Sequence, residues 1–338
     1  MRNMILRGVL GAVAAIGIGV GGAWAQPKPV DVTFGLDFVV LGRHAPWYVA
    51  LAKGYYRDAG LNVKIVPGQG TAQAIQAVEA DITQFAFSDV PSLLIARGRG
   101  ASSAKMLAVN YQKAPYAIFS LDPGANVTTP EGLKGLEIAS GAGSFSAKVI
   151  QGFAKEKGID PASIKFVNVD GAARVSMLLG AKVPAIETFI FGEPGISRRT
   201  GDAKLRTLLL ADHGLDLYAN GIVARQATIR GKPDMVRAFV GASLKGWQDA
   251  LANPEEAAKL QAGLVPGLEP AAIVDEIKIL KTLAVTPYTQ ANGLGAIDPA
   301  QMRKAADFVV NTVGIEGKIP DVTELYTSEF MPQPAVKP

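Results

Sequence analysis

The 338-residue sequence contains no cysteine. Without cysteine there are no disulfides, no thiolate metal ligands and no cysteine nucleophile, and a lipoprotein anchor has no acceptor. Histidine is also scarce, because His44 and His213 are the only two and neither has an acidic cluster at metal-ligand spacing. We therefore expect no metal site and no cofactor, and we assign no role to His213.

Common enzyme signatures are missing too. There is no Walker A loop, no G-x-S-x-G elbow and no H-E-x-x-H helix. A formal G-x-G-x-x-G match at 17–22 has no strand before it and is a false positive. Basic residues are scattered singly, so the net charge of +4 does not indicate nucleic-acid binding. These absences favour a protein that is not an enzyme and does not bind nucleic acid.

The first 25 residues have the pattern of an export signal. Arg2 and Arg7 form a basic start, residues 8–22 are uncharged, and Ala23-Trp24-Ala25 provides small residues at the two positions that a signal peptidase inspects. The apolar run is shorter than the roughly 20 residues of a spanning helix and is diluted by glycine, which argues against the alternative of an uncleaved anchor. We expect cleavage before Gln26 and a free periplasmic protein without a lipid anchor.

From residue 30 onward, strand-like and helix-like patterns alternate, which predicts βαβ units around a mostly parallel sheet. The first block predicts strands at 32–36, 61–65, 85–87, 106–109 and 116–121, with helices at 46–59 and 71–80. The second block predicts strands at 136–139, 165–169, 185–191 and 205–210, a short helix from 129, and helices at 144–157 and 174–180. The final third is helical, and the tail after Met331 is expected to lack fixed structure.

A glycine loop followed by a hydroxyl residue recurs in both blocks, as Gly68-Gln69-Gly70-Thr71 and as Gly141-Ala142-Gly143-Ser144. The glycines expose backbone N–H groups and the hydroxyl can cap the following helix, so each helix start suits an electronegative group. The alternative is two ordinary strand–helix turns. Ligands of open α/β sheets bind at the carboxyl ends of strands. We therefore predict ligand contacts at Gly70, Thr71, Gly141, Gly143 and Ser144.

Leu36-Asp37 and the run from His44 to Tyr56, which reads HAPWYVALAKGYY, are similar to a family pattern His-x-x-x-Tyr-Val-Ala-x-x-x-Gly-Tyr-Phe. The chain resembles the thiamine-pyrimidine-synthesis-like and nitrate/sulfonate/taurine group of ABC-transporter substrate-binding proteins. The similarity continues at 67–70, 85–89, 129–135, 218–223, 233–239, 246–247 and 253–254.

This resemblance implies a type II periplasmic-binding fold of the α/β class. Each of two lobes would hold a mixed, mostly parallel sheet flanked by helices, and two chain crossings would form a hinge, near 112–116 and 212–218. The expected parts are a signal peptide at 1–25, lobe I at 26–114 and 215–330, lobe II at 115–214 and a tail at 331–338. The implied partners are a small-molecule ligand and an inner-membrane permease with its ATPase, and we expect a monomer.

The resemblance also selects side chains. Asp37, His44 and Tyr48 resemble the pyrimidine-precursor binders, because a carboxylate accepts hydrogen bonds from an amino-heterocycle and aromatic rings stack on it. Alternatively, Asp37 caps a helix, His44 is a surface or capping residue, and Tyr48 is core. Trp47 and Trp247 fit helix faces that pack. Further candidate acceptors or hinge contacts are Ser88, Asp89, Glu187, Glu193, Tyr218 and Asn220.

Three carboxylates around a cleft would repel a sulfonate or nitrate unless some face away. We therefore favour a pyrimidine-like or other nitrogen heterocycle over taurine or another alkanesulfonate, nitrate or an aromatic carboxylate. Phe38 stands where pyrimidine binders often carry Trp. A sensory binding protein without its own transporter is a further alternative. The thiamine-pyrimidine-synthesising enzymes of this fold are cytosolic and cysteine-rich, and this chain has an export signal and no cysteine.

Overall fold

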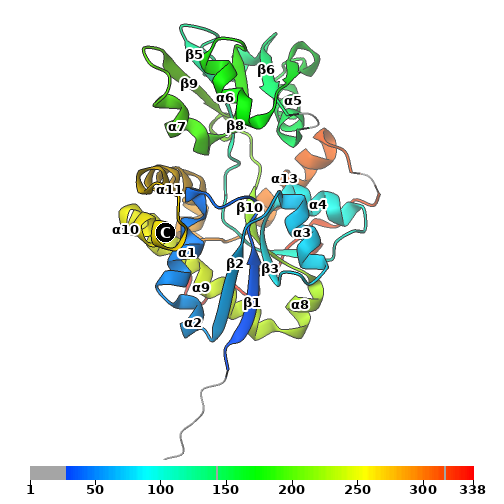
Figure 1. Ribbon diagram of the computed structural model, residues 1–338. Helices are drawn as coiled ribbons and strands as arrows, with labels where there is room; N and C mark the ends of the chain where they lie inside the picture. The colour runs from blue at the N-terminus through cyan, green and yellow to red at the C-terminus, as the bar shows by residue number, and fades with distance from the viewer. Residues whose placement is uncertain (1–27, 142–143, 316) are drawn as a thin grey trace, which may run out of the picture.

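The computed structural model describes residues 28–141, 144–315 and 317–338. The expected signal peptide and Gly143 lie outside the described residues. The described chain forms two lobes, each built on a five-stranded sheet, and Figure 1 shows lobe II in green above lobe I. No helix among the described residues is both long and apolar enough to cross a membrane.

Sheet A, in lobe I, has the strand order β2-β1-β3-β10-β4. β1 pairs in parallel with β2 and β3, whereas β10 runs antiparallel to both β3 and β4. Its strands are β1 (Val30–Gly35), β2 (Leu61–Val66), β3 (Phe85–Asp89), β4 (Lys105–Val109) and β10 (Asn220–Ala224).

Sheet B, in lobe II, repeats this plan with the order β7-β6-β8-β5-β9. β6 pairs in parallel with β7 and β8, and β5 runs antiparallel to β8 and β9. Its strands are β5 (Tyr116–Asp122), β6 (Glu137–Ser140), β7 (Lys165–Asn168), β8 (Ala185–Phe189) and β9 (Lys204–Leu209).

In each sheet the antiparallel strand is the one that follows a crossing from the other lobe. β5 follows β4 after residues 110–115, and β10 follows the 3-10 helix η5 (Leu210–His213) after residues 214–219. The two crossings lie side by side between the lobes (Figure 1). The predicted fold class, two mixed α/β sheets joined by two chain crossings, is confirmed.

The helices flank the sheets. Lobe II carries α5 (Phe145–Glu156), α6 (Gly171–Leu179) and α7 (Glu193–Ser197), with the short 3-10 helices η2 (Pro130–Leu133), η3 (Pro161–Ser163) and η4 (Ile190–Gly192). The remaining helices are η1 (Gly42–His44), α1 (Ala45–Ala52), α2 (Tyr55–Asp58), α3 (Thr71–Glu79), α4 (Val90–Gly98), α8 (Gln226–Gly231), α9 (Pro233–Ala252), α10 (Pro254–Leu264), α11 (Pro270–Ala284), α12 (Pro287–Asn292), α13 (Pro299–Thr312) and η6 (Val322–Glu324).

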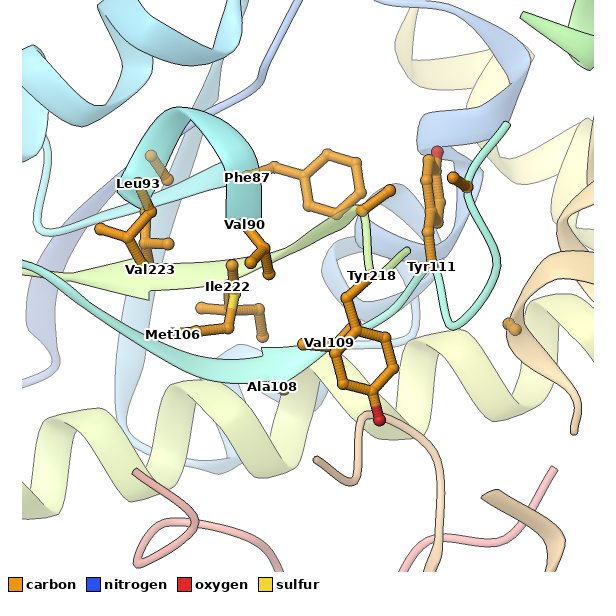
Figure 2. Close-up of a cluster of buried hydrophobic side chains, with 14 of the residues drawn as sticks. Phe87, Val90, Leu93, Met106, Ala108, Val109, Tyr111, Tyr218, Ile222 and Val223 are labelled. Carbon is orange, nitrogen blue, oxygen red and sulfur yellow. The ribbon is translucent and has the colours of Figure 1, made fainter. Parts of the chain in front are cut away.

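The core of lobe I centres on the strand that returns from lobe II. Every residue of β10 is buried, and Figure 2 shows Ile222 and Val223 between Val90 and Leu93 of α4 and the side chains of β4. Strand β2, by contrast, alternates buried and exposed residues at its start, as its sequence pattern predicts. An uninterrupted run of buried residues, as in β10, is typical of a strand in the middle of a sheet that is covered on both faces.

Two sequence expectations are wrong. The helix predicted over 46–59 is split at Gly54, whose φ of 77° is left-handed, so α1 ends and α2 restarts. The tail after Met331 is not free: Val336 O accepts a hydrogen bond from Leu294 N, and Lys337 O accepts one from Gln248 Nε2, both at 2.8 Å. Prolines remove donors from this tail, but its carbonyls still accept hydrogen bonds from the body.

Candidate functional site

The predicted ligand residues lie near strand ends in both lobes and form two polar clusters. We call Asp37, Arg43, His44 and Asn220 the Asp37 cluster, which joins the loop after β1 to the first residue of β10. We call Ser140, Ser144, Arg174 and Glu187 the Glu187 cluster, which joins β6, β8, α6 and the start of α5.

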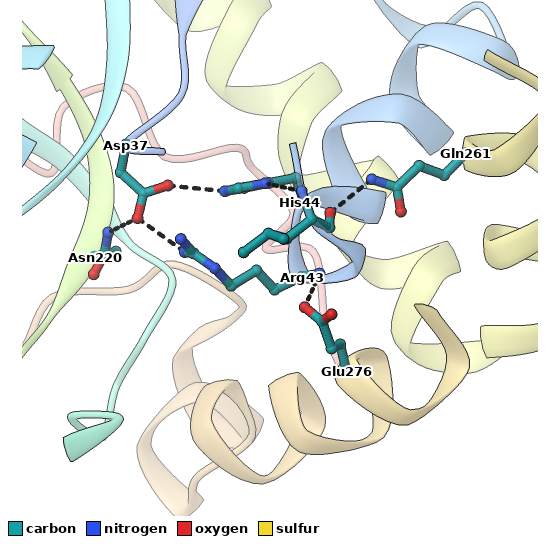
Figure 3. Close-up of polar contacts among 7 residues, drawn as sticks. Asp37, Arg43, His44, Asn220, Gln261 and Glu276 are labelled. Atoms are coloured by element: carbon teal, nitrogen blue, oxygen red, sulfur yellow. Dashed lines mark hydrogen bonds and ion pairs between the residues drawn. The ribbon is translucent and has the colours of Figure 1, made fainter. Parts of the chain in front are cut away.

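The Asp37 carboxylate is saturated by donors of its own chain (Figure 3). His44 Nε2 lies 2.8 Å from Oδ1, while Arg43 Nη1 at 2.8 Å and Asn220 Nδ2 at 2.9 Å donate to Oδ2. Asp37 is buried and does not cap the following helix. These hydrogen bonds connect the loop after β1 to β10, the strand that follows the second crossing.

His44 is fully buried and both of its ring nitrogens are engaged. Nδ1 accepts from Leu41 N at 3.0 Å, so Nε2 carries the proton that is donated to Asp37. Burial and the Arg43 charge lower the pKa of His44, against the opposing effect of Asp37, so the ring is neutral. His44 is therefore not a surface residue, and it makes no side-chain capping bond to α1.

The charges of Asp37 and Arg43 compensate each other inside the Asp37 cluster. Burial alone raises the pKa of Asp37, but the Arg43 charge and the His44 hydrogen bond outweigh it and hold that pKa well below its usual range. The loop is also fixed from outside, because Arg43 N donates to Glu276 Oε2 and Gln261 Nε2 donates to Leu41 O, both at 2.8 Å. A buried ion pair with further hydrogen bonds is costly to break.

Lobe II touches this cluster through one aromatic ring. The Arg43 guanidinium lies 5.7 Å from the centroid of the Phe191 ring, which belongs to η4. Tyr111, in the first crossing, packs against the same ring at 5.7 Å. The Asp37 cluster thus contacts lobe II at the hinge.

Asp89 caps α4 from the end of β3, since its Oδ1 accepts from Ser92 N at 2.6 Å. Thr71 does not cap α3 as expected; its hydroxyl lies 2.7 Å from Ser92 Oγ, and its carbonyl accepts from Ser88 Oγ at 3.0 Å. Gly70 occupies the cap position with a φ of 137°. Burial raises the pKa of Asp89, against the hydrogen bonds from Ser92 and Thr71.

The Glu187 cluster is arranged differently. Glu187 Oε1 accepts three hydrogen bonds, from Arg174 Nη1 at 2.7 Å, Ser140 Oγ at 2.9 Å and Ser144 Oγ at 3.2 Å. The side chain is only 5% exposed, so it does not point to solvent, whereas Arg174 is 20% exposed. Ser144 therefore does not cap α5 as predicted, because its hydroxyl turns to the carboxylate.

Three polar atoms of this cluster have no hydrogen-bond partner among the described residues. Among the described residues, none forms a hydrogen bond with Glu187 Oε2 or with Arg174 Nη2, and Arg174 Nε is buried without a partner. A Cβ on Gly171 would come within 3.3 Å of Nη2, and one on Gly141 within 3.7 Å. A side chain at either glycine would therefore contact the guanidinium group of Arg174.

Aromatic side chains lie beside the Glu187 cluster. Tyr116, at the start of β5, packs edge-on against Phe189 at 5.5 Å, and its ring is tilted against that of Phe145 at 6.2 Å. Burial raises the pKa of Tyr116 well above its ordinary value, and the negative charges of Asp89 and Glu187, one from each lobe, add to the rise. Tyr48 is nearly buried, and burial raises its pKa too.

Two further candidates, Tyr218 and Glu193, also lie outside both clusters. Tyr218 is buried in the second crossing, where its hydroxyl accepts from Asp298 N at 2.9 Å, and Figure 2 shows its ring turned away from Phe87. Glu193 begins α7, accepts from Thr207 Oγ1 at 3.1 Å, and lines a separate cavity of about 350 Å³ together with His213. In the described part of the chain, no group of three or more His, Asp or Glu residues is placed to hold a metal.

Sequence reasoning missed Arg43, Arg174 and Tyr116. Arg174 carried a usable signal, because a cation in the first turn of a helix is unfavourable unless a nearby anion compensates it. Arg43 could have been noticed as a charge next to His44 in a loop between two apolar segments. Tyr116 gave no signal, since an aromatic residue at a strand start is ordinary.

Comparison with known proteins gives one family model. Residues 42–257 match the family described as NMT1/THI5 like. This range includes all of the Glu187 cluster and every member of the Asp37 cluster except Asp37 itself.

Two curated relatives are binding proteins. The riboflavin-binding protein RibY of Chloroflexus aurantiacus is 29% identical over 316 residues, covering 91% of this chain and 88% of the relative. The formylaminopyrimidine-binding protein of Halalkalibacterium halodurans is 22% identical over 223 residues, covering 66% of this chain and 67% of the relative.

Solved structures share the fold at low identity. The aliphatic sulphonate binding protein SsuA of Escherichia coli aligns with a TM-score of 0.66 at 15% identity, covering 88% of this chain and 97% of that one. The alkanesulfonate-binding protein SsuA of Xanthomonas axonopodis pv. citri, bound to MOPS, has a TM-score of 0.62 at 16% identity, with the same coverage. At such identities the likeness concerns the fold alone.

Proposed function

The chain belongs to the NMT1/THI5-like family, and we propose that it is the periplasmic solute-binding component of an ABC importer for a neutral nitrogen heterocycle. It would hold the solute between its lobes without chemical change and deliver it to an inner-membrane permease with its ATPase. The names of the two curated relatives, one a riboflavin binder and one a formylaminopyrimidine binder, support this class of ligand.

The observation that carries the proposal is the pairing of charges at the strand ends. Arg43 is paired with Asp37 and Arg174 with Glu187, so neither cluster contains a cation without a carboxylate. A sulfonate or nitrate ion would find no uncompensated side-chain cation in either cluster, and next to two carboxylates it would be repelled. A neutral ring with polar edges loses nothing to this charge pattern and can use the hydrogen-bonding atoms that remain.

Apolar surface near the strand ends suits a ring. Phe38 and Val39, adjacent in the loop after β1, are 47% and 49% exposed. Tyr116, Phe145 and Phe189 add aromatic surface in lobe II. Offset or edge-on aromatic contacts favour a planar heterocycle by about 0.5–1.5 kcal/mol per pair beyond area burial.

We also propose how the chain is divided and where it works. Lobe I would comprise 26–114 and 215–330 and lobe II 115–214, with the crossings as the hinge that closes on the solute. The leader at 1–25 would direct export, after which the protein acts as a periplasmic monomer. Asn220 would couple strand and hinge, because its carbonyl accepts from Asn110 N and Tyr111 N of the first crossing at 2.9 and 2.8 Å.

Thermal unfolding with a ligand panel tests the proposal. The protein from Gln26 onward, unfolded and refolded to remove any co-purified solute, would be heated with riboflavin, formylaminopyrimidine, taurine, nitrate or benzoate. A ligand that binds only the folded state at 100 times its Kd stabilises it by about 2.7 kcal/mol, so we expect a clear rise in melting temperature with a heterocycle. A rise with the anions alone, or with none of the five, contradicts the proposal.

A further inference from the structure

Only one oxygen of the Glu187 carboxylate accepts hydrogen bonds from the described side chains. All three of its side-chain donors converge on Oε1, and no described residue donates to Oε2, although the side chain is 5% exposed. A carboxylate oxygen without a donor from its own chain must find one in the solvent or in a bound molecule. The free oxygen is therefore a place where a bound molecule with an N–H group gains a strong, charge-assisted hydrogen bond.

Only one nitrogen of the Arg174 guanidinium group donates hydrogen bonds to described residues. Its Nη1 donates twice, to the Glu187 backbone carbonyl at 2.8 Å and to Oε1 at 2.7 Å, while Nη2 has no described acceptor. The guanidinium is planar and cannot lose its charge, so the direction of the remaining N–H groups is fixed by the two bonds already made. Gly141 and Gly171 place no side chain against that edge.

Taken together, one ion pair leaves an acceptor on Glu187 and a donor on Arg174 without a partner among the described residues. From this juxtaposition we infer that the Glu187 cluster reads a lactam edge, a ring carbonyl next to a ring N–H, with Arg174 Nη2 donating to the carbonyl oxygen and Glu187 Oε2 accepting from the N–H. The inference rests on the proposed function and narrows its ligand class. Flavins and oxopyrimidines carry such an edge, and simple aminopyrimidines do not.

The balance of charge separates the lactam edge from an aminopyrimidine edge. A basic aminopyrimidine gains most from a carboxylate whose charge is not neutralised, since it can then bind as the protonated ring. Arg174 already compensates the charge of Glu187, two hydroxyl groups also donate to that carboxylate, and the Arg174 charge repels a protonated ring. A neutral lactam meets no such repulsion, and its carbonyl oxygen offers in-plane lone pairs to the guanidinium.

The test uses riboflavin and 3-methylriboflavin, which differ only at the ring N–H, with flavin fluorescence as the readout. We expect methylation to weaken binding to the unaltered protein at least tenfold. Glu187→Gln should weaken riboflavin binding about tenfold and reduce the methylation penalty to less than threefold, because the acceptor for that N–H is lost. Arg174→Gln and the charge-keeping Arg174→Lys should each weaken riboflavin binding at least tenfold.

Arg199→Gln, at an exposed arginine of lobe II after α7, serves as the matched control and should leave riboflavin affinity unchanged. The inference is overturned, with the proposed function intact, if riboflavin binds but methylation and both Arg174 variants change its affinity less than twofold. It is equally overturned if formylaminopyrimidine binds and riboflavin does not. Failure of every heterocycle to bind removes both the inference and the proposed function. The 3-methylriboflavin comparison needs no variant, so a misfolded variant does not block the test.

Discussion

The two polar clusters contain the same kinds of residues but differ in how many of their hydrogen-bonding atoms have partners. Each has a buried carboxylate, an arginine and neutral hydrogen-bonding partners. In the Asp37 cluster both carboxylate oxygens are occupied, and the ring nitrogens of His44 are occupied as well. In the Glu187 cluster one carboxylate oxygen and two guanidinium nitrogens have no partner among the described residues. The first arrangement ties parts of the fold together, and the second leaves atoms that the solute would use in our proposal.

This difference shows why residue type alone does not identify a ligand contact. Asp37 and Glu187 are equally buried carboxylates near strand ends, so a sequence pattern treats them alike. What separates them is the number of internal donors that reach each oxygen. A carboxylate with no free oxygen stabilises the fold, and one with a free oxygen can contribute binding energy.

The largest expected effect is on stability, at Asp37. Asp37→Asn leaves the buried Arg43 charge without its anion, and we expect a loss of about 3–5 kcal/mol in the free energy of unfolding. Glu187→Gln should cost about 1 kcal/mol or less, because the partly exposed Arg174 can be solvated. Urea unfolding of both variants measures the contrast, and equal losses would remove the distinction between the clusters.

A smaller effect is expected at Asn220. Asn220→Ala removes one buried hydrogen bond to the charged Asp37, which should cost about 1.5–3 kcal/mol in the free energy of unfolding. Asn62→Ala is the matched control, because Asn62 Nδ2 makes the same kind of bond to Asp31 on an exposed surface, at 2.7 Å. That change should stay within about 0.5 kcal/mol. If the two substitutions cost the same in urea unfolding, the Asp37 cluster does not tie parts of the fold together as described above.

The smallest expected effect depends on pH. The pKa of His44 is lowered in the folded state from an ordinary value of 6.5 by burial and by Arg43, so below about pH 6.5 the unfolded chain takes up a proton that the folded chain does not. Stability should therefore fall as pH drops from 7.5 toward 5, and His44→Gln should flatten this fall. Asp89 and Glu276, whose pKa values are raised by burial, act in the opposite direction but equally in both proteins.

Melting temperatures between pH 7.5 and 5 measure this effect as the difference between the two slopes. His213→Gln, in η5, is the control for the loss of a histidine as such. Identical slopes for the unaltered protein and His44→Gln would mean that His44 titrates alike in the folded and unfolded states. The neutral ring assigned to the Asp37 cluster would then be wrong.

Much of the fold could be predicted from local patterns. The Leu61–Val66 alternation and the glycine-bounded helices are properties of short windows, and most predicted strands lie within two residues of the observed ones. Strand β10 escaped because its residues, interrupted by Gly221, show no alternation. Its place between β3 and β4 depends on partners more than 100 residues away.

The residue types of the site could be predicted from the sequence, but the contacts between these residues could not. Asp37 and Glu187 could be selected by residue type and position, whereas their use is decided by distant partners. Asn220 is 183 positions from Asp37, and Ser140 is 47 positions from Glu187. Which oxygen of a carboxylate stays free is a property of packing in three dimensions, which a single sequence does not display.

The placement of β10 also sets an order of assembly. All five strands of sheet B come from one uninterrupted stretch, 116–209, whereas sheet A needs residues 220–224 inserted between strands made much earlier. Because the chain is synthesised from the N-terminus onward, lobe II can complete its sheet while lobe I still lacks an inner strand. The lobe that begins the sequence is therefore the last to close, and until β10 arrives, β3 and β4 have no strand between them.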